Sequence, residues 1–575
     1  MRTLDWVVLF LTLLSIVIYG IYKGKGTRTI RGFFLADKSM KWYTVALSIM
    51  ATQASAITFT STPGQAYVDG MRFVQFYFGL PIAMVILSIT AVPIFHKLNV
   101  YTAYEYLEYR FDLKTRTLTS FLFLIQRGLA AGMTIYAPSI VLSVILGWDI
   151  RITSSVIGGA IIIYTTSGGV KAVNWTDFQQ MLIIMFGMIM AFIMTIVLLP
   201  SGVSFTDALH VAGGMGKLNL IDFSFDLNNR YNFWSGIIGG MFVALAYFGC
   251  DQSQVQRYLT GQSITQSRLG LLFNGIAKVP MQFFILLLGA MVFVFYQYVQ
   301  PPLFFNPVET RKIQEGAYAE AYEQLESKYA EVFEEKSKSL REYIDVKSSG
   351  DPVSIAQAQA NFQTADNRAN EIRGEAVHMI KAQSGSLATN DTNYIFLSFV
   401  IKYLPLGLVG LVFACIFAAT MSSTSGELSA LATCSVVDIY KRHIKTDGDE
   451  PHYLMISRLA MASWGIYGIL FAQFASGLGS LVEAVNILGS LFYGTLLGIF
   501  LLGFYFKWIG GTATFLGAVI SEAIVLTLFL LEYGFKSITV AWLWYPVVGC
   551  GVVIIAAMVL NTFLTGTNKQ KSFAI

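Results

Sequence analysis

The sequence predicts an all-α polytopic membrane protein, and three features lead to this prediction. Of its 575 residues, 55% are hydrophobic and only 13% are charged, whereas about a quarter of the residues of a soluble domain carry charge. The mean hydropathy is +0.59. A bilayer core of ~30 Å needs about 20 apolar residues per spanning helix, and stretches of this kind recur along the chain.

We interpret thirteen apolar stretches as membrane spans. They cover residues 5–23, 42–62, 73–95, 117–145, 152–168, 177–199, 232–250, 268–299, 404–437, 453–475, 480–505, 511–532 and 541–565. The chain then divides into a first span with its loop (1–41), a five-helix repeat (42–199), a loop (200–231), a second five-helix repeat (232–505) and two C-terminal spans with a short tail (506–575).

The placement of basic residues predicts the topology. They follow the first, third and ninth spans, within residues 23–41, 110–116 and 441–445. The positive-inside rule puts these segments in the cytoplasm, so we expect the N-terminus outside and the C-terminus, with Lys569 and Lys571, inside. The first stretch lacks a basic start and a small-residue cleavage site, which favours an anchor over a signal peptide. We expect a multi-pass protein of the plasma (inner) membrane.

Residues 305–392 interrupt the membrane pattern. Residues 309–381 alone hold 24 of the 74 charged side chains. Apolar side chains from Tyr318 to Val332 recur at spacings of three and four, which is typical of an amphipathic helix, and residues 348–352 indicate a turn. We expect an extracytoplasmic helical hairpin, either a solvated cap or an arm for a protein partner.

Several classes of function lack their signatures. The sequence has no phosphate-binding P-loop, no metal cluster among its five histidines and no nucleophile elbow. Its four cysteines lie in or beside apolar stretches and form no disulfide or zinc pattern. We therefore expect no enzyme and no nucleic-acid partner, and transport driven by an ion gradient.

Two stretches are unusually rich in hydroxyl groups for membrane helices. Residues 48–64 read SIMATQASAITFTSTPG, and residues 415–438 read CIFAATMSSTSGELSALATCSVVD. Pro63 and Gly64 loosen the hydrogen-bond ladder of a helix and free carbonyls, and neutral oxygens suit a hard cation such as Na⁺ that must also be released. The alternative in both cases is close packing between helices.

The seventh span ends in ALAYFGCDQ, residues 244–252. Gly249 can mark a second interrupted helix, and two broken helices in corresponding halves point to the binding site of a transporter. The second and seventh spans lie five apart, which fits two inverted five-helix repeats.

Three ionisable residues within spans are candidates for function. Asp177, at the start of the sixth span, is either a helix cap or a ligand. Arg127 lies near the midplane of the fourth span, where it either binds a carboxylate substrate or ties helices together. Glu427 lies deep in the ninth span, and the sequence names no partner for it.

Four motifs in order resemble the sodium/solute symporter family. They are YAPSIVLSVILGWDI, SGGVKAVNWTDFQQ, FGCDQSQVQRYLTG and ATMSSTSGELSALATCSVVDIYKR. The resemblance implies a LeuT-like 5+5 inverted-repeat core and Na⁺ as the coupling ion. By the same resemblance, Ala51, Ala54, Ala419, Ser422 and Ser423 bind sodium. Asp177, Ser422 and Ser425 match a second sodium site, although Gly426 stands where other members carry a hydroxyl.

The resemblance also implies a substrate site. Ser55 and Thr58 match carboxylate-binding positions of sialic acid members, and Tyr247 matches an inner aromatic gate. Together with Gln53, Tyr77 and Arg127 they form the predicted substrate-binding set. Ala244 and Ile57 replace sugar-binding side chains, which argues against galactose-type recognition, and together with Arg127 these losses lead us to expect an organic anion. A sugar symporter or a proton-coupled symporter, and in other classes a membrane sensor or a channel, are the alternatives.

Overall fold

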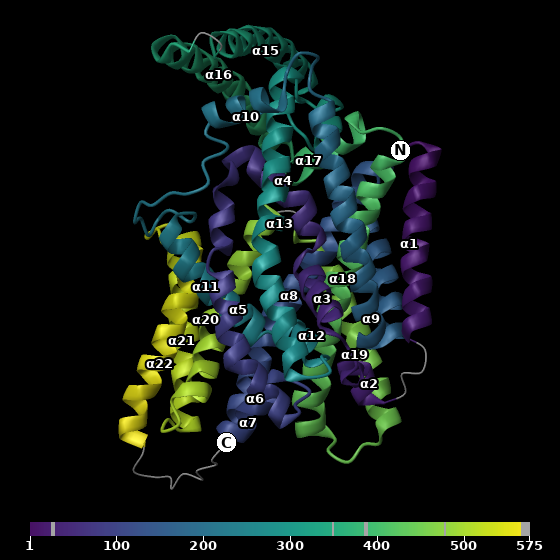
Figure 1. Cartoon of the computed structure of the whole chain (residues 1–575), viewed down its shortest axis with the longest axis vertical. Helices are drawn as coiled ribbons and strands as arrows, with labels where there is room; N and C mark the ends of the chain where they lie inside the picture. The colour runs from purple at the N-terminus through teal and green to yellow at the C-terminus, as the bar shows by residue number, and fades with distance from the viewer. Residues whose placement is uncertain (25–28, 348–349, 385–388, 476–478, 565–575) are drawn as a thin grey trace.

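The computed structural model describes residues 1–24, 29–347, 350–384, 389–475 and 479–564, and its arrangement is shown in Figure 1. Ten of its helices are long and apolar enough to cross a membrane, counted over these residues. In chain order the main helices are α1 (Thr3–Gly24), α2 (Ile30–Leu35), α3 (Trp42–Gln53), α4 (Ala56–Asp69), η2 (Met71–Tyr77), α5 (Leu80–Ile89), α6 (Ala91–Leu98), α7 (Ala103–Arg110), α8 (Leu113–Leu146), α9 (Ile150–Val197), α10 (Phe205–Gly214), η3 (Ser235–Gly239), α11 (Gly240–Gly249), α12 (Gln252–Leu259), α13 (Ile264–Tyr298), α14 (Pro307–Gln314), α15 (Ala319–Lys347), α16 (Pro352–Ser384), α17 (Thr392–Tyr403), α18 (Leu408–Thr433), η5 (Cys434–Ile444), α19 (Glu450–Ala472), α20 (Leu481–Tyr505), α21 (Gly511–Phe529) and α22 (Tyr545–Leu564).

The all-α prediction is confirmed, and the three remaining predicted spans are shorter or broken helices. The stretch 42–62 is divided between α3 and α4. Residues 150–163 and 235–249 form apolar helical segments of 10–17 residues. The predicted spans 152–168 and 177–199 both lie in α9, which breaks at Gly169, where φ is 62° and ψ is 173°.

The backbone is unwound near Ala51, as expected, but Pro63 and Gly64 do not interrupt the helix. The helix axis breaks instead at Ala54 (φ −87°, ψ 68°) and Ser55 (φ −72°, ψ 172°), and α4 continues through Pro63. Close packing holds α4 straight at this point. A Cβ atom on Gly64 would collide with the Thr392 carbonyl of α17, and one on Gly289 would collide with the Pro63 carbonyl.

A second break separates α11 from α12, as Gly249 predicted. Cys250 adopts φ −123° and ψ −26°, and Asp251 then caps α12 by accepting a 2.9 Å hydrogen bond from the Ser253 amide. Side-chain caps of this kind satisfy amides that have no partner within the helix. The interruption therefore places a carboxylate at a helix N-terminus inside the bundle.

The helical insert is confirmed as a hairpin of α15 and α16, which lies across one end of the bundle (Figure 1). We call this end the insert end. Lys347 donates to Asp207 at 2.7 Å, and Gln359 and Gln363 donate to the Gly214 carbonyl at 2.8 and 2.9 Å. Hydrogen bonds from Lys347 and Ser204 lower the pKa of Asp207 to about 2, so the carboxylate stays charged at neutral pH. The predicted turn includes residues 348–349, which lie outside the described residues.

The chain enters and leaves the bundle at opposite ends. The first residue lies at the insert end, α1 covers one flank, and α21 with α22 covers the other flank and ends at the far end (Figure 1). Lys569 and Lys571 of the predicted tail lie outside the described residues.

Candidate functional site

A cavity of about 110 Å³ lies between the two broken helices. All six residues of the predicted substrate set line it: Gln53, Ser55, Thr58, Tyr77, Arg127 and Tyr247. They come from α3, the α3–α4 break, α4, η2, α8 and α11. The structure therefore brings together side chains that are up to 194 residues apart in sequence, from Gln53 to Tyr247.

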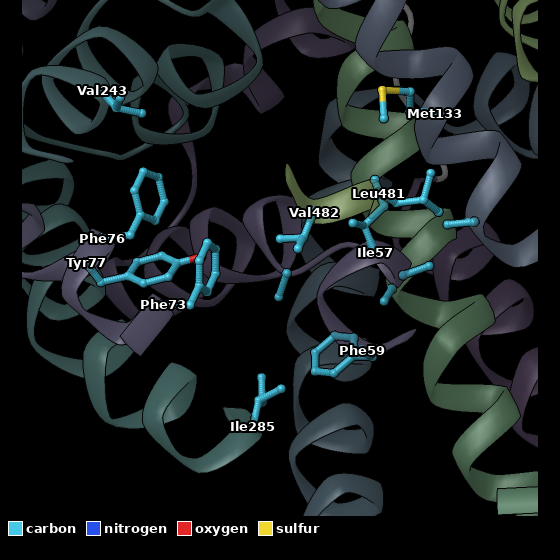
Figure 2. Close-up of a cluster of buried hydrophobic side chains, with 14 of the residues drawn as sticks. Ile57, Phe59, Phe73, Phe76, Tyr77, Met133, Val243, Ile285, Leu481 and Val482 are labelled. Carbon is cyan, nitrogen blue, oxygen red and sulfur yellow. The ribbon is translucent and has the colours of Figure 1, made fainter. Parts of the chain in front are cut away.

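One side of the cavity is apolar. Figure 2 shows Phe76 and Tyr77 side by side and Val482 close to Ile57, and these four residues and Val243 all line the cavity. The rings of Phe76 and Tyr77 meet at a centroid distance of 4.8 Å and an interplanar angle of 79°. An apolar wall with a few polar groups facing it is typical of small-molecule sites.

The polar side centres on Arg127, which contacts two carboxylates. Its Nη1 donates to Glu427 Oε1 at 3.1 Å, and its Nη2 donates to Asp251 Oδ2 and, at 3.1 Å, to the Tyr493 hydroxyl. The guanidinium carbon lies 5.3 Å from the Tyr247 ring centroid. The two alternatives for Arg127 therefore coexist, because it ties α8 to α18 and to the α11–α12 break and also faces the cavity.

Five cavity-lining residues each carry a buried polar atom without a hydrogen-bond partner among the described residues. These atoms are Thr52 Oγ1, Gln53 Oε1, Gln126 Oε1, Arg127 Nε and Glu427 Oε2. More than 90% of buried polar groups in proteins are hydrogen-bonded, and an unsatisfied one costs about 1–3 kcal/mol. Such a concentration at one cavity is typical of a site whose ligand supplies the missing partners.

A second polar cluster surrounds Asp177 on α9. Its carboxylate accepts hydrogen bonds of 2.6 Å from Ser48 on α3 and from Ser422 on α18. Asp177 lies within the segment of α9 that follows the break at Gly169, eight residues beyond that break, so the cap interpretation is wrong. The carboxylate instead joins three core helices.

The predicted sodium residues lie where the α3–α4 break meets α18. Ala51, Ala54 and Ala419 are fully buried, and Ser422 and Ser423 are 1% exposed, so none faces lipid. The last four carbonyls of a helix have no partner within it, and Ala51 lies in the last turn of α3. Thr52 provides contact between the two elements, because a Cβ atom on Gly426 would lie 3.2 Å from its methyl group.

The serine protons on α18 are already engaged. Ser423 donates to the Ala419 carbonyl at 2.9 Å, and Ser425 donates to the Ser422 carbonyl at 3.0 Å. Ser422 donates to Asp177. Each hydroxyl oxygen thus keeps lone pairs that a cation can use.

Arg257 lies beside Gly426, next to the residues that match a second sodium site. Its Nη1 donates to Asn174 Oδ1 at 3.1 Å, and the same oxygen accepts from Ser48. A Cβ atom on Gly426 would lie 2.7 Å from Arg257 Nη2. The glycine therefore gives room to a guanidinium beside the Asp177 cluster.

Sequence reasoning missed two charged residues near the cavity. Lys278 on α13 is fully buried, its Nζ has no hydrogen-bond partner among the residues described, and it lies 5.8 Å from the centroid of the Tyr77 ring. Asp251 was not identified as the partner of Arg127. A charge inside a span is itself a signal of function, so Lys278 was open to recognition, whereas the pairing of Asp251 depends on tertiary structure.

Two broken helices around a small polar cavity, inside a bundle of apolar helices, define a secondary active transporter. Comparison with known proteins supports this class. A sequence profile described as the Sodium:solute symporter family matches residues 33–321 and 374–521, leaving out much of the hairpin. The chain belongs to this family, and it is a multi-pass membrane protein that couples solute transport to sodium.

Individual relatives are distant. The chain is 28% identical over 535 residues to sodium-coupled monocarboxylate transporter 1 of Xenopus laevis, with 91% of this chain and 71% of the relative covered. It is 26% identical over 571 residues to the sodium/sialic acid symporter of Proteus mirabilis, with coverage of 97% and 94%. The solved structure of a Na⁺-coupled sialic acid symporter in a substrate-bound outward-open state superposes with a TM-score of 0.74 at 23% identity, covering 98% of each chain. This likeness confirms the fold.

Proposed function

We propose that the chain takes up a small organic monoanion with one sodium ion. The observation that carries this proposal is the balance of buried charge around the cavity and the α3–α4 break. Three buried cations, Arg127, Arg257 and Lys278, are matched in number by three buried carboxylates, Asp177, Asp251 and Glu427. Because these charges cancel, a bound Na⁺ adds one uncompensated positive charge, which a monoanion neutralises.

The cavity itself favours an anion of few carbons. Its volume of about 110 Å³ is below the ~300–1,000 Å³ typical of drug-sized ligands. Arg127 lines the cavity and has a buried Nε donor without a partner among the described residues, and the Lys278 ammonium lies 5.8 Å from the centroid of the Tyr77 ring, which also lines it. Names of two relatives support the same class, since they describe monocarboxylate and sialic acid transport.

We assign sodium binding to Ala51, Ala54 and Ala419 through their carbonyls and to Ser422 and Ser423 through their hydroxyls. Their support is complete burial at a helix break together with hydroxyl protons that are already engaged. Sodium there would join α3 to α18 and prepare the adjoining cavity for solute. Arg257 beside Gly426 argues against a second sodium at Asp177, Ser422 and Ser425.

We expect uptake to be electroneutral. In proteoliposomes, an inward sodium gradient should drive accumulation of a short monocarboxylate, and sodium-free vesicles should show none. An imposed potential, negative inside, should leave the rate unchanged, because one Na⁺ and one monoanion carry no net charge. Stimulation by the potential would require more than one sodium per anion and would contradict the charge balance, since each further charge gains ~2.3 kcal/mol per 100 mV.

We place the insert end outside the cell, following the basic residues at the opposite end. At the insert end, Arg230 donates to Glu483 of α20 and, at 3.3 Å, to Asp69 of α4. Together these contacts hold the two helices over the cavity. Arg230 is 41% exposed, and exposed ion pairs contribute about 0–1 kcal/mol each.

Arg230→Gln should therefore shift the protein toward the outward-open state by about fivefold. A membrane-impermeant thiol reagent added outside should label a cysteine placed at Val485, in the cavity wall, about fivefold faster in this background. The four native cysteines are buried. Arg72→Gln, which removes a neighbouring 3.9 Å contact to Asp222, is the matched control. Equal labelling rates of the Val485 cysteine in the otherwise unmodified protein, in Arg230→Gln and in Arg72→Gln would show that Arg230 does not help to close the outer side of the cavity.

A further inference from the structure

The cavity offers hydrogen-bond acceptors that lack donors. Glu427 Oε2, Gln53 Oε1 and Gln126 Oε1 all line it without partners among the described residues. The oxygen and nitrogen of a side-chain amide exchange places on rotation, but both oxygens of a carboxylate only accept. An ionised Glu427 is therefore the one of these three groups that cannot turn a donor toward the cavity instead.

Glu427 is held so that one oxygen stays available. Its Oε1 accepts from Arg127 Nη1 at 3.1 Å, while the side chain is 8% exposed. The Thr134 hydroxyl also lines the cavity and lies within reach of Glu427, but it already donates to the Ala130 carbonyl at 3.1 Å. Asp251, by contrast, accepts from Arg127, Tyr493 and both the amide and the hydroxyl of Ser253. Of the two carboxylates on Arg127, Glu427 is the one that a solute can contact.

The buried charges around the cavity determine which kind of solute group can donate a hydrogen bond to Glu427. The three cations and three carboxylates of the core already cancel, and sodium with a monoanion preserves this balance. A solute that met Glu427 with an ammonium group would carry its own positive charge and leave the sodium uncompensated. A hydroxyl donates without changing the balance.

We propose that Glu427 determines specificity by accepting a hydrogen bond from a hydroxyl group of the solute, whose carboxylate contacts Arg127. The substrates are then small hydroxycarboxylates. This inference rests on the proposed uptake of a monoanion, and it adds a second recognition group four residues beyond Ser423 on the same helix. A solute without the hydroxyl leaves the carboxylate oxygen unsatisfied, which is the basis of strong discrimination in polar sites.

Three probes with the same carbon skeleton test the proposal: lactate, propionate and alanine. In proteoliposomes with an inward sodium gradient, the wild-type protein should take up lactate with a kcat/KM about tenfold or more above those of propionate and alanine. In Glu427→Met the ratio of lactate to propionate should fall about tenfold, and the ratio cancels any general effect on anions or on protein yield. Glu427→Gln retains an accepting oxygen and should keep part of the preference.

Glu522→Met is the matched control. Glu522 is a buried glutamate on α21, and it is not among the residues that line the cavity. Its replacement should leave the ratio unchanged. Sodium-dependent uptake of lactate and propionate at equal efficiency would overturn the proposed role of Glu427 but not the proposed uptake of a monoanion. A preference for alanine would also overturn the role of Glu427. Failure of the wild-type protein to transport any of these carboxylates would overturn the monoanion proposal itself.

Discussion

Arg127→Gln should abolish sodium-driven uptake of carboxylates and destabilise the protein. The substitution leaves Asp251 and Glu427 buried without their cation, and removing one partner of a buried ion pair costs about 3–5 kcal/mol. We expect a loss of uptake of at least 100-fold for anionic probes and a clearly lower melting temperature in detergent. Neutral solutes should suffer less, because they do not use the guanidinium.

A double variant separates the structural part of this loss from recognition. Arg127→Gln combined with Asp251→Asn removes one positive and one negative charge, so much of the thermal stability should return. Uptake of carboxylates should not return, because the donor that faces the cavity is still absent. If the double variant transported carboxylates like the wild type, Arg127 would serve only to tie α8 to its neighbours.

The spans and the hairpin were predictable because their signals are local. Hydropathy identifies a spanning helix from about 20 neighbouring residues, and the charged segment 309–381 stands out by composition alone. The break in the second span was less accessible. Pro63 and Gly64 suggested it, but packing against Thr392 and Gly289 keeps that turn helical and the backbone opens at Ala54.

The partners of charged side chains were not predictable from one sequence. Arg127 and Glu427 lie 300 residues apart, and Arg127 and Asp251 lie 124 apart. The sequence shows that each charged side chain lies inside a span, where burying it costs free energy. Only the arrangement of the helices decides which carboxylate contacts which cation. The resemblance to a family supplied the sodium residues and the substrate set, and the cavity collects that substrate set without exception.

The structure also changes the argument for an organic anion. The sequence led us to expect an organic anion from Arg127 together with the lost sugar-binding side chains. The two carboxylate neighbours of Arg127 weaken that reason, because Arg127, Asp251 and Glu427 together carry a net negative charge. The preference for an anion therefore depends on Lys278 and on the sodium ion as well as on Arg127.

Ser423→Ala should raise the sodium concentration for half-maximal uptake about tenfold. The substitution removes one oxygen from the proposed site, and a tenfold change corresponds to ~1.4 kcal/mol, within the range for a hydrogen bond to a charged group. Because Ser423 bonds only to carbonyls of its own helix, the variant should fold normally. Initial rates of uptake over a sodium titration, with choline as replacement, measure the effect.

Substitutions of two further serines serve as controls for the Ser423→Ala result. Ser521 on α21 is a fully buried serine away from the cavity, with a 2.8 Å hydrogen bond to the Gly549 carbonyl, so Ser521→Ala controls for loss of any buried hydroxyl. Ser425→Ala reports on a second sodium. If Arg257 fills that place, Ser425→Ala leaves the sodium dependence and a Hill coefficient of about 1 unchanged. An unaltered titration in Ser423→Ala would remove this hydroxyl from the site, and coupling would then have to depend on the carbonyls at the α3–α4 break.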